Sequence, residues 1–267
     1  MVEHATMTSV STVASPLRGK GTMSIIKTIA DSAPIQIALT IPIYGLYAAV
    51  AGLSMLPSAM LLGWGIRTLA SADRWLAFSM VLGLSLFVFF MTAVIVMGLA
   101  IRVLSLGIKP GRYPEKSTTV LRWLVYSGIF NMMTKLVLPM VPMSFMTNMF
   151  FRLVGCRIGR GVKLNSFQLN DAYLLTIGDG VVIGGQADVS CHLYENSHLV
   201  LLPISIGAGT VIGAHCYVSP GVSIGSNCLI GLGCYIRQGR QVPDGEKLTS
   251  VAGVSLQTAQ RLEKGRF

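Results

Sequence analysis

The chain has 267 residues, of which 52% are hydrophobic and only 12% are charged, and its formal net charge is +10. This composition excludes an ordinary soluble protein and predicts segments inside a membrane. The positive charge can be explained by a membrane, because basic residues beside a bilayer bind anionic lipid head groups. The sequence also lacks features that would point to nucleic acid, namely aromatic residues interleaved with basic ones and cysteines or histidines at zinc-site spacing. We therefore expect membrane lipid as a partner and no nucleic acid.

Residues 1–33 are rich in serine and threonine and contain no apolar stretch of the kind found in a cleaved signal, so we predict a cytoplasmic tail. Two windows without charged residues come next: Ser32–Ile66 and Trp75–Ile101. Each is longer than the roughly 20 residues that cross a bilayer core, which predicts transmembrane helices over residues 34–104. Since the first window contains Pro42 and Pro57, it is either a kinked span with an interfacial turn or a re-entrant segment.

Positive charge is unevenly distributed around these windows. Between residues 102 and 122 there are five basic residues and one acid, whereas the connector Arg67–Arg74 has two basic residues and one acid. By the positive-inside rule, both chain ends lie in the cytoplasm, which predicts the inner (cytoplasmic) membrane with the C-terminal domain on the cytoplasmic side. Five cysteines form no even-numbered disulfide framework and fit that reducing compartment.

Residues 105–155 form a juxtamembrane region. Its segment Leu136–Phe151 is apolar and rich in methionine but holds Pro139 and Pro142, which argues against one straight buried helix. We expect an interfacial helical region lying on the bilayer, and a third span is the alternative. The methionines are better explained by adaptable packing at a membrane surface than by a groove for a lipid substrate.

Residues 156–250 follow a repeat of six. Aliphatic residues recur at every sixth position: Ile206, Ile212, Val218, Ile224, Ile230, Ile236 and Val242. A second phase contains Ile177, Ile183 and Val189, and a weaker start is Ile158 and Leu164. This period predicts a left-handed parallel β-helix, in which three six-residue units complete a coil, the aliphatic side chains fill the interior and glycines turn the corners. The fold class is thus a membrane α-helical N-terminal region followed by an all-β hexapeptide-repeat domain, with a tail over residues 251–267.

Three cysteines occupy one slot of the repeat. Cys216, Cys228 and Cys234 each stand four residues after an aliphatic anchor, where Thr210 and Val222 stand in neighbouring units. Small residues at such a position are buried in the β-helix, so we interpret the cysteines as core residues without a metal or redox role.

The repeat fails at one place. Val189 and Ile206 are 17 residues apart, one short of a coil, and the segment between them carries His192, Tyr194, Glu195 and His198. We predict that a loop leaves the β-helix here, and loops held on rigid scaffolds are where catalytic residues concentrate.

The hexapeptides resemble those of the hexapeptide-repeat acyltransferase superfamily. A second resemblance, to the membrane-embedded terminal domain of poly-lysine-synthetase-type nonribosomal peptide synthetases and its freestanding relatives, covers roughly residues 105–250. It is carried by these stretches: KPGRYP (Lys109–Pro114), VLRWLV (Val120–Val125), FRLVGCRIGRGV (Phe151–Val162), YLLTIGDGVVIG (Tyr173–Gly184) and HLYEN (His192–Asn196). The last reads His-Leu-aromatic-Glu-Asp in that family, so Asn196 departs from its pattern.

The first resemblance implies an acyltransferase in which a loop histidine deprotonates an acceptor hydroxyl or amine that attacks an acyl thioester. His192 is then the expected general base and Glu195 the residue that orients it. Tyr194, Asn196 and His215 are candidate acceptor-binding residues. Candidate donor-binding residues are Gly213, Gly231, Arg237 and Lys247, with backbone amides near the two glycines as oxyanion donors.

The resemblance also implies a homotrimer with active sites between subunits. The sequence contains no adenylation or phosphopantetheine-carrier motif, so we expect no tightly bound cofactor and a donor that arrives as acyl-CoA or on an acyl or peptidyl carrier protein. The Val-Pro-Pro-Gly turn that usually ends hexapeptide acetyltransferases is present only in part, as Val242–Gly245, which argues against an ordinary acetyl-CoA pocket.

Three alternatives stay open. A γ-carbonic-anhydrase-like metalloenzyme shares the β-helix, but histidine spacings of 6 and 17 do not resemble that family's pattern. A non-catalytic trimeric scaffold would anchor or partner a membrane synthase. A transporter is disfavoured because the two apolar windows contain no charged residue.

Overall fold

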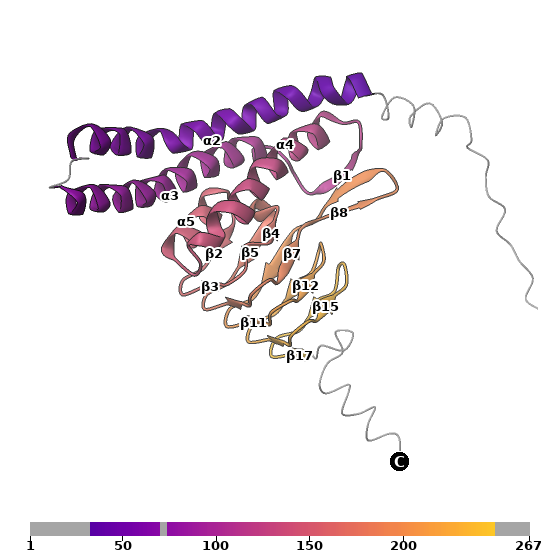
Figure 1. Ribbon diagram of the computed structural model, residues 1–267. Helices are drawn as coiled ribbons and strands as arrows, with labels where there is room; N and C mark the ends of the chain where they lie inside the picture. Colours follow the sequence, from indigo (N-terminus) through magenta and orange to yellow (C-terminus); the bar gives the residue numbers. More distant parts are fainter. Residues whose placement is uncertain (1–32, 70–73, 249–267) are drawn as a thin grey trace, which may run out of the picture. The chain divides into compact units, whose positions relative to one another are not determined.

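The computed structural model describes residues 33–69 and 74–248, so the predicted N-terminal and C-terminal tails lie outside the described residues. The chain divides into two compact units, residues 1–45 and 46–267. Helix α2 (Ala33–Leu69) runs from the first unit into the second, and everything that follows in the chain belongs to the second unit. Figure 1 shows the elements in chain order.

Helices α2 and α3 (Trp75–Ser105) are the two long helices. Helix α2 continues through Pro42 and Pro57 without a break, so the predicted re-entrant segment or interfacial turn is wrong. Within α2 and α3, the stretches Thr40–Leu69 and Trp75–Ser105 are long and apolar enough to cross a bilayer, with mean hydropathies of 1.6 and 2.6. The Thr92 hydroxyl of α3 donates a hydrogen bond of 2.6 Å to the carbonyl of Ser54 in α2.

The segment between α3 and the β-helix contains strand β1 (Gly111–Pro114) and four short helices. The helices are α4 (Thr118–Met132), the π-helix η1 (Met133–Val137), the 3₁₀-helix η2 (Leu138–Met140) and α5 (Phe145–Leu153). The side chain of Ser117 caps α4 by accepting a hydrogen bond from the amide of Val120. Tyr126, Phe130, Phe150 and Phe151 form a buried aromatic cluster that joins α4 to α5.

This segment has a second, exposed side. Leu136, Met140, Met143 and Phe145 are all more than half exposed, although they are large and apolar. The segment therefore has one side in the protein core and one exposed apolar side. Its position at a membrane interface stays a prediction.

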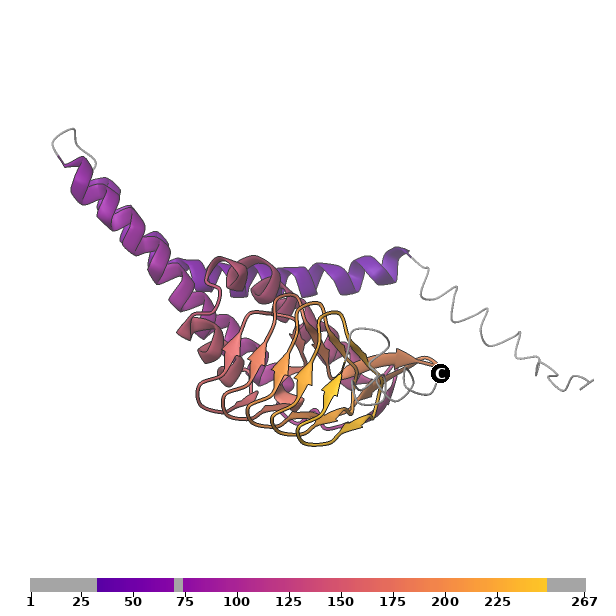
Figure 2. The ribbon, with the colours of Figure 1, turned by 90° about the horizontal axis from the view of Figure 1, so that it is seen from below.

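Residues 157–248 form a parallel β-helix with three faces, and Figure 2 shows its successive coils side by side. The first face contains β2 (Arg157–Ile158), β5 (Leu175–Ile177), β10 (Ile204–Ile206), β13 (Ser223–Ile224) and β16 (Gln241–Val242). The second contains β3 (Lys163–Leu164), β6 (Val182–Ile183), β11 (Val211–Ile212), β14 (Leu229–Ile230) and β17 (Lys247–Leu248). The third contains β4 (Leu169–Asn170), β7 (Asp188–Ser190), β12 (Tyr217–Val218) and β15 (Tyr235–Ile236).

The predicted coil of 18 residues is confirmed by the strand register. Ile206 pairs with Ile224, and Ile224 pairs with Val242, which lies one further coil along the chain. All three side chains are buried, as are those of Cys216, Cys228 and Cys234. The prediction that these cysteines are core residues is therefore confirmed, and all five cysteines of the chain are buried.

Glycine is required where consecutive coils approach each other at the corners. A Cβ atom added to Gly207 would lie 2.5 Å from backbone atoms of Gly225 and Ser226 in the next coil. No side chain fits at that separation, so the aliphatic-glycine pairs of the sequence follow from the stacking of the coils.

The predicted loop after Val189 is a β-hairpin. Strands β8 (His192–Glu195) and β9 (His198–Leu201) pair antiparallel, and β1 (Gly111–Pro114) adds to β9 as a third strand. The turn residues Asn196 and Ser197 both have positive φ, which is the backbone of a two-residue type I′ turn. The hairpin is inserted between β7 on the third face and β10 on the first face, so that it leaves the β-helix next to β7 (Figure 1).

Candidate active site

The β-helix is irregular at a second place, between β4 and β5. After β4 the chain forms a short 3₁₀-helix, η3 (Ala172–Leu174), before it rejoins the first face at β5. Asp171 begins this irregularity with a left-handed backbone, φ 55° and ψ 46°, and its side chain is buried. The left-handed region is more accessible to Asp than to most residues, which explains an aspartate at this turn.

The buried Asp171 meets the base of the hairpin. Its Oδ2 lies 2.5 Å from Nδ1 of His192, the first residue of β8. Its Oδ1 accepts a hydrogen bond of 2.7 Å from Nε1 of Trp123, a buried residue of α4. The indole of Trp123 also packs edge-on against the imidazole, with ring centroids 4.9 Å apart. Three segments distant in the sequence, α4, the η3 turn and β8, therefore hold one carboxylate-imidazole pair.

The electrostatics of His192 reflect two opposed effects. Burial alone lowers the pKa of the imidazole, but the hydrogen bond and the negative charge of Asp171, with a further contribution from Asp188, outweigh it and raise the pKa above its ordinary value. A short contact between a buried carboxylate and an imidazole stabilises the imidazolium and makes the ring a stronger base.

A cavity of about 100 Å³ lies beside this pair. Its walls include Trp123, Asn131, Asn170, Asp171 and His192. Nδ2 of Asn170 donates a hydrogen bond of 3.0 Å to Oδ1 of Asp188 in β7, and the hydroxyl of Ser190 donates to the backbone carbonyl of His192 at 3.0 Å. Within residues 33–69 and 74–248, Nε2 of His192 has no hydrogen-bond partner, so this nitrogen is free to act on a ligand.

Part of the repeat matches a known family. Residues 203–238 match the family described as "Hexapeptide repeat of succinyl-transferase". Residues 203–238, which lie within the β-helix of residues 157–248, are therefore similar to a known hexapeptide repeat. The chain is also 30% identical over 145 residues to delta-poly-L-ornithine synthetase of Acinetobacter baumannii, a match that covers 54% of this chain and 11% of that protein. The predicted resemblances to the hexapeptide-repeat superfamily and to a poly-amino-acid synthetase are confirmed.

Similar solved structures are acetyltransferases. One is a hexapeptide-repeat acetyltransferase of Vibrio cholerae complexed with acetyl coenzyme A, 22% identical, covering 38% of this chain and 59% of that chain with a TM-score of 0.35. Another is a maltose O-acetyltransferase of Clostridium difficile, 12% identical, covering 60% and 94% with a TM-score of 0.41. TM-scores of this size do not establish a common fold, and the architecture of the β-helix rests on its own strand register.

The structure corrects the predicted partner of His192. The carboxylate on the imidazole is that of Asp171, whereas Glu195 lies at the far end of β8, where Oε1 is 3.2 Å from Nη1 of Arg112 in β1. Side chains of His192 and Glu195 three residues apart on an extended strand point to opposite faces, so Glu195 cannot serve as the orienting residue in this hairpin.

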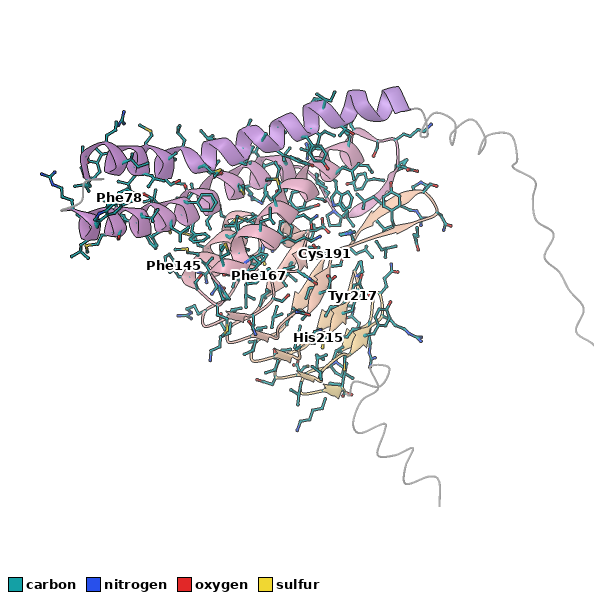
Figure 3. The ribbon with its side chains drawn as sticks, viewed as in Figure 1. Phe78, Phe145, Phe167, Cys191, His215 and Tyr217 are labelled. Atoms are coloured by element: carbon teal, nitrogen blue, oxygen red, sulfur yellow. The ribbon has the colours of Figure 1, made fainter. Side chains whose placement is uncertain are left out.

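The other predicted acceptor-binding residues lie apart from the cavity. Tyr194 is 48% exposed on β8, and Asn196 supplies the hairpin turn, where its carbonyl accepts a hydrogen bond from Nδ1 of His198. His215 is exposed at a corner between β11 and β12, on a coil farther from α4 than Cys191, the neighbour of His192 (Figure 3). None of the three is among the residues that line the cavity.

The predicted donor-binding residues belong to the later, regular coils. The amide of Gly213 donates to the carbonyl of Ile230, and the amide of Gly231 donates to that of Leu248, at 2.8 and 2.9 Å. Because both N–H groups are used between coils, the prediction that they serve as oxyanion donors is wrong for these two glycines. Arg237 and Lys247 are exposed on the outside of the same coils, and their role in donor binding stays a prediction.

Among the described residues, no group of three or more His, Cys, Asp or Glu side chains is placed to hold a metal ion. The histidines His192, His198 and His215 are engaged in three different local structures: the Asp171 pair, the hairpin turn and a corner of the β-helix. The arrangement around His192 can therefore bind and move a proton, and it can do so beside a cavity that admits one small functional group.

Proposed function

We propose that the protein is a membrane-anchored acyltransferase that moves an acyl group from a thioester donor to an amine or hydroxyl acceptor. His192 is the general base, and Asp171 orients it and stabilises its cation. The observation that carries the proposal is the imidazole of His192, held at Nδ1 by a buried carboxylate and free at Nε2 beside a cavity. The donor is an acyl-CoA or an acyl group on a carrier protein.

The reaction needs little more than this pair. Nε2 takes the proton of the acceptor N–H or O–H as the new bond to the acyl carbon forms. The carbon-sulfur bond then breaks, and the imidazolium returns the proton to the leaving thiolate, so that a thiol is released. A base whose pKa is raised above that of free histidine is suited to the first transfer and still yields its proton to a thiolate.

The charges around the cavity favour an amine acceptor. Besides Asp171, the carboxylate of Asp188 lies in the same neighbourhood, because it is bonded to the cavity residue Asn170. Burial raises the pKa of Asp188, while Asn170 and His192 oppose that rise, and the described residues give it no salt-bridge partner. An arriving ammonium group would supply the missing cation, and it releases one proton to solvent before the neutral amine attacks the acyl carbon. An amine acceptor agrees with the name of the Acinetobacter relative, a synthetase of poly-L-ornithine.

The membrane anchor is supported by the two long apolar helices and by the exposed apolar side of η1, η2 and α5. In this proposal the hexapeptide-repeat domain lies on the cytoplasmic side of the inner membrane, where thioester donors are made, and three chains assemble so that neighbouring subunits complete each site. An anchored catalytic domain suits an acceptor that is amphiphilic or delivered at the membrane surface.

The test is acyl transfer by the purified protein in detergent or nanodiscs, with acyl-CoA and carrier-bound donors and with matched amine and hydroxyl acceptors. We expect release of free thiol with amine acceptors, and a loss of about 10²–10⁴-fold in rate in His192→Ala, the usual scale for a lost general base. The control is His215→Ala, which removes an exposed imidazole outside the cavity and should keep most activity. Transfer at the full rate by His192→Ala, or loss of transfer in His215→Ala alone, would refute the assignment.

A further inference from the structure

The indole of Trp123 brings a hydrogen bond to the Asp171–His192 pair from α4, a helix outside the β-helix and its hairpin. Trp123 lies on α4, is 8% exposed, and donates its N–H to Oδ1 of Asp171 at 2.7 Å. The other oxygen, Oδ2, is engaged with Nδ1 of His192 at 2.5 Å. Each oxygen of one buried carboxylate therefore has its own partner, and the carboxylate cannot rotate without breaking one contact or the other.

We propose that Trp123 is a positioning residue that controls which nitrogen of His192 carries the proton. The inference deepens the proposed acyl transfer and rests on it for its catalytic meaning. An indole N–H is a donor only, so the atom of residue 171 that faces it must be an acceptor. The remaining oxygen then faces Nδ1, which must donate, and the neutral imidazole keeps its proton on Nδ1 and presents Nε2 as the base.

The contact has a consequence that packing alone does not have. In Asp171→Asn, the side chain has one oxygen and one NH₂ group. Because Trp123 requires the oxygen, the NH₂ group is turned toward Nδ1 of His192, which must then accept. The imidazole is forced to carry its proton on Nε2, the nitrogen that should take a proton from the acceptor. An isosteric change would thus switch off the base through the tautomer.

Removal of the indole N–H should undo this switch. In the double variant Asp171→Asn/Trp123→Phe, the phenyl ring keeps an aromatic surface beside the imidazole. It has no N–H group, so it does not require a hydrogen-bond acceptor at residue 171. The amide is then free to turn its oxygen toward Nδ1 and restore the tautomer with a free Nε2. A residue that only packs against His192 has no means to produce such a rescue.

The decisive measurement is the tautomer of His192, read from ring nitrogen shifts and long-range proton-nitrogen correlations in protein labelled with ¹⁵N-histidine. Spectra are taken well above the pKa of the imidazole, and His192→Gln identifies its signals among those of the four histidines. We expect Nδ1–H in the wild type and in Trp123→Phe, Nε2–H in Asp171→Asn, and a return to Nδ1–H in the double variant. Nδ1–H in Asp171→Asn, or Nε2–H that persists in the double variant, would overturn the inference.

Rates of acyl transfer separate this inference from the function on which it rests. We expect Asp171→Asn to be strongly impaired and the double variant to be faster than Asp171→Asn, although it carries one more substitution. A double variant that is slower than Asp171→Asn contradicts positioning by Trp123. If the tautomers switch as expected and no thioester donor is consumed by any of the four proteins, the positioning role holds and the acyltransferase proposal fails.

Discussion

The coils that follow Ile206 and the coils that precede it differ in one respect. The later coils keep the six-residue repeat through β17, whereas the earlier coils are interrupted by η3 and by the β8–β9 hairpin. Two aspartates show what this difference means. Asp244, in a corner of the later coils, accepts a backbone hydrogen bond of 2.7 Å from Ser226 in the coil before it. Asp171, in the first interruption, holds the imidazole of His192.

An aspartate thus has a structural role where the repeat is regular, as at Asp244, and a chemical role where the repeat is interrupted, as at Asp171. Regular coils satisfy their backbone groups from one coil to the next, as the amides of Gly207, Gly213 and Gly225 do, and this leaves few polar groups free for a ligand. An interruption places side chains from distant segments together and makes room for a cavity. The regular coils supply the rigid support that keeps this arrangement in place.

The largest expected effect is on activity, and it distinguishes the two aspartates. Asp171→Gly is compatible with the left-handed backbone at this position and removes the carboxylate from both Trp123 and His192. We expect the rate of acyl transfer to fall by about 10²–10⁴-fold, because the imidazole loses the group that orients it and stabilises its cation.

The matched control is Asp244→Ala, which loses one hydrogen bond between coils. It should lower stability by about 0.5–1.5 kcal/mol and leave the rate of transfer unchanged. Steady-state rates and thermal unfolding followed by circular dichroism give both quantities. Equal rates for the wild type and Asp171→Gly would mean that the interruption at η3 is a structural detail without a catalytic role.

The next effect is on stability, and it distinguishes two corner glycines. In Gly207→Ala the new methyl group would meet backbone atoms of the next coil at 2.5 Å, and backbone cannot yield as a flexible side chain can. We expect a loss of about 1–3 kcal/mol or more. Gly185, a corner glycine of the earlier coils, has the Asn165 amide at 3.4 Å as its closest neighbour, so Gly185→Ala should change stability by less than about 1 kcal/mol. Similar melting temperatures for the two variants would contradict the close stacking of the later coils.

The fold of the C-terminal half could be predicted almost completely because its signal is local and repeated. Each inward position, such as Ile212, Ile224 or Ile230, is an aliphatic residue six places from the next, and the register of the strands follows from that spacing. The hairpin was predicted only as a loop. Its turn at Asn196 and Ser197 depends on positive φ at both residues, for which Asn-Ser is a weaker signal than Asn-Gly.

The site was predicted only in part, and the reason is distance along the chain. His192 stands in the interruption that the repeat reveals, but Trp123 is 69 and Asp171 is 21 positions away from it, so no spacing rule connects the three. Glu195 was predicted as the orienting residue because it stands three positions after His192 in the sequence. A weak signal for Asp171 did exist. The six-residue spacing of aliphatic residues from Ile158 and Leu164 predicts another aliphatic residue at position 170, but Asn170 and Asp171 stand there, before the spacing resumes at Ile177.

A smaller effect concerns pH. The acid limb of kcat/KM should have an apparent pKa above about 6.5, because only the neutral imidazole is a base and Asp171 and Asp188 raise its pKa against the effect of burial. Activity is therefore lost as the pH falls through this raised value. Asp188→Asn removes one of the two negative charges and should move the limb to lower pH, whereas Asp244→Asn should not move it. An unchanged apparent pKa of the acid limb in Asp188→Asn would show that Asp188 does not act on His192.

The smallest effect is expected at Glu195, the residue that its position in the sequence favoured. Glu195→Gln breaks the ion pair with Arg112, in which both side chains are more than 40% exposed, and exposed pairs contribute at most about 1 kcal/mol to stability. Because Glu195 belongs to the hairpin turn region and not to the Asp171 pair, the rate and the acid limb of the pH profile should both stay at the wild-type values. Arg112→Gln removes the same ion pair from the β1 side and should behave in the same way. A rate loss in Glu195→Gln as large as that in Asp171→Gly, with Arg112→Gln unimpaired, would return the orienting role to Glu195 and require the hairpin to adopt another conformation when substrate binds.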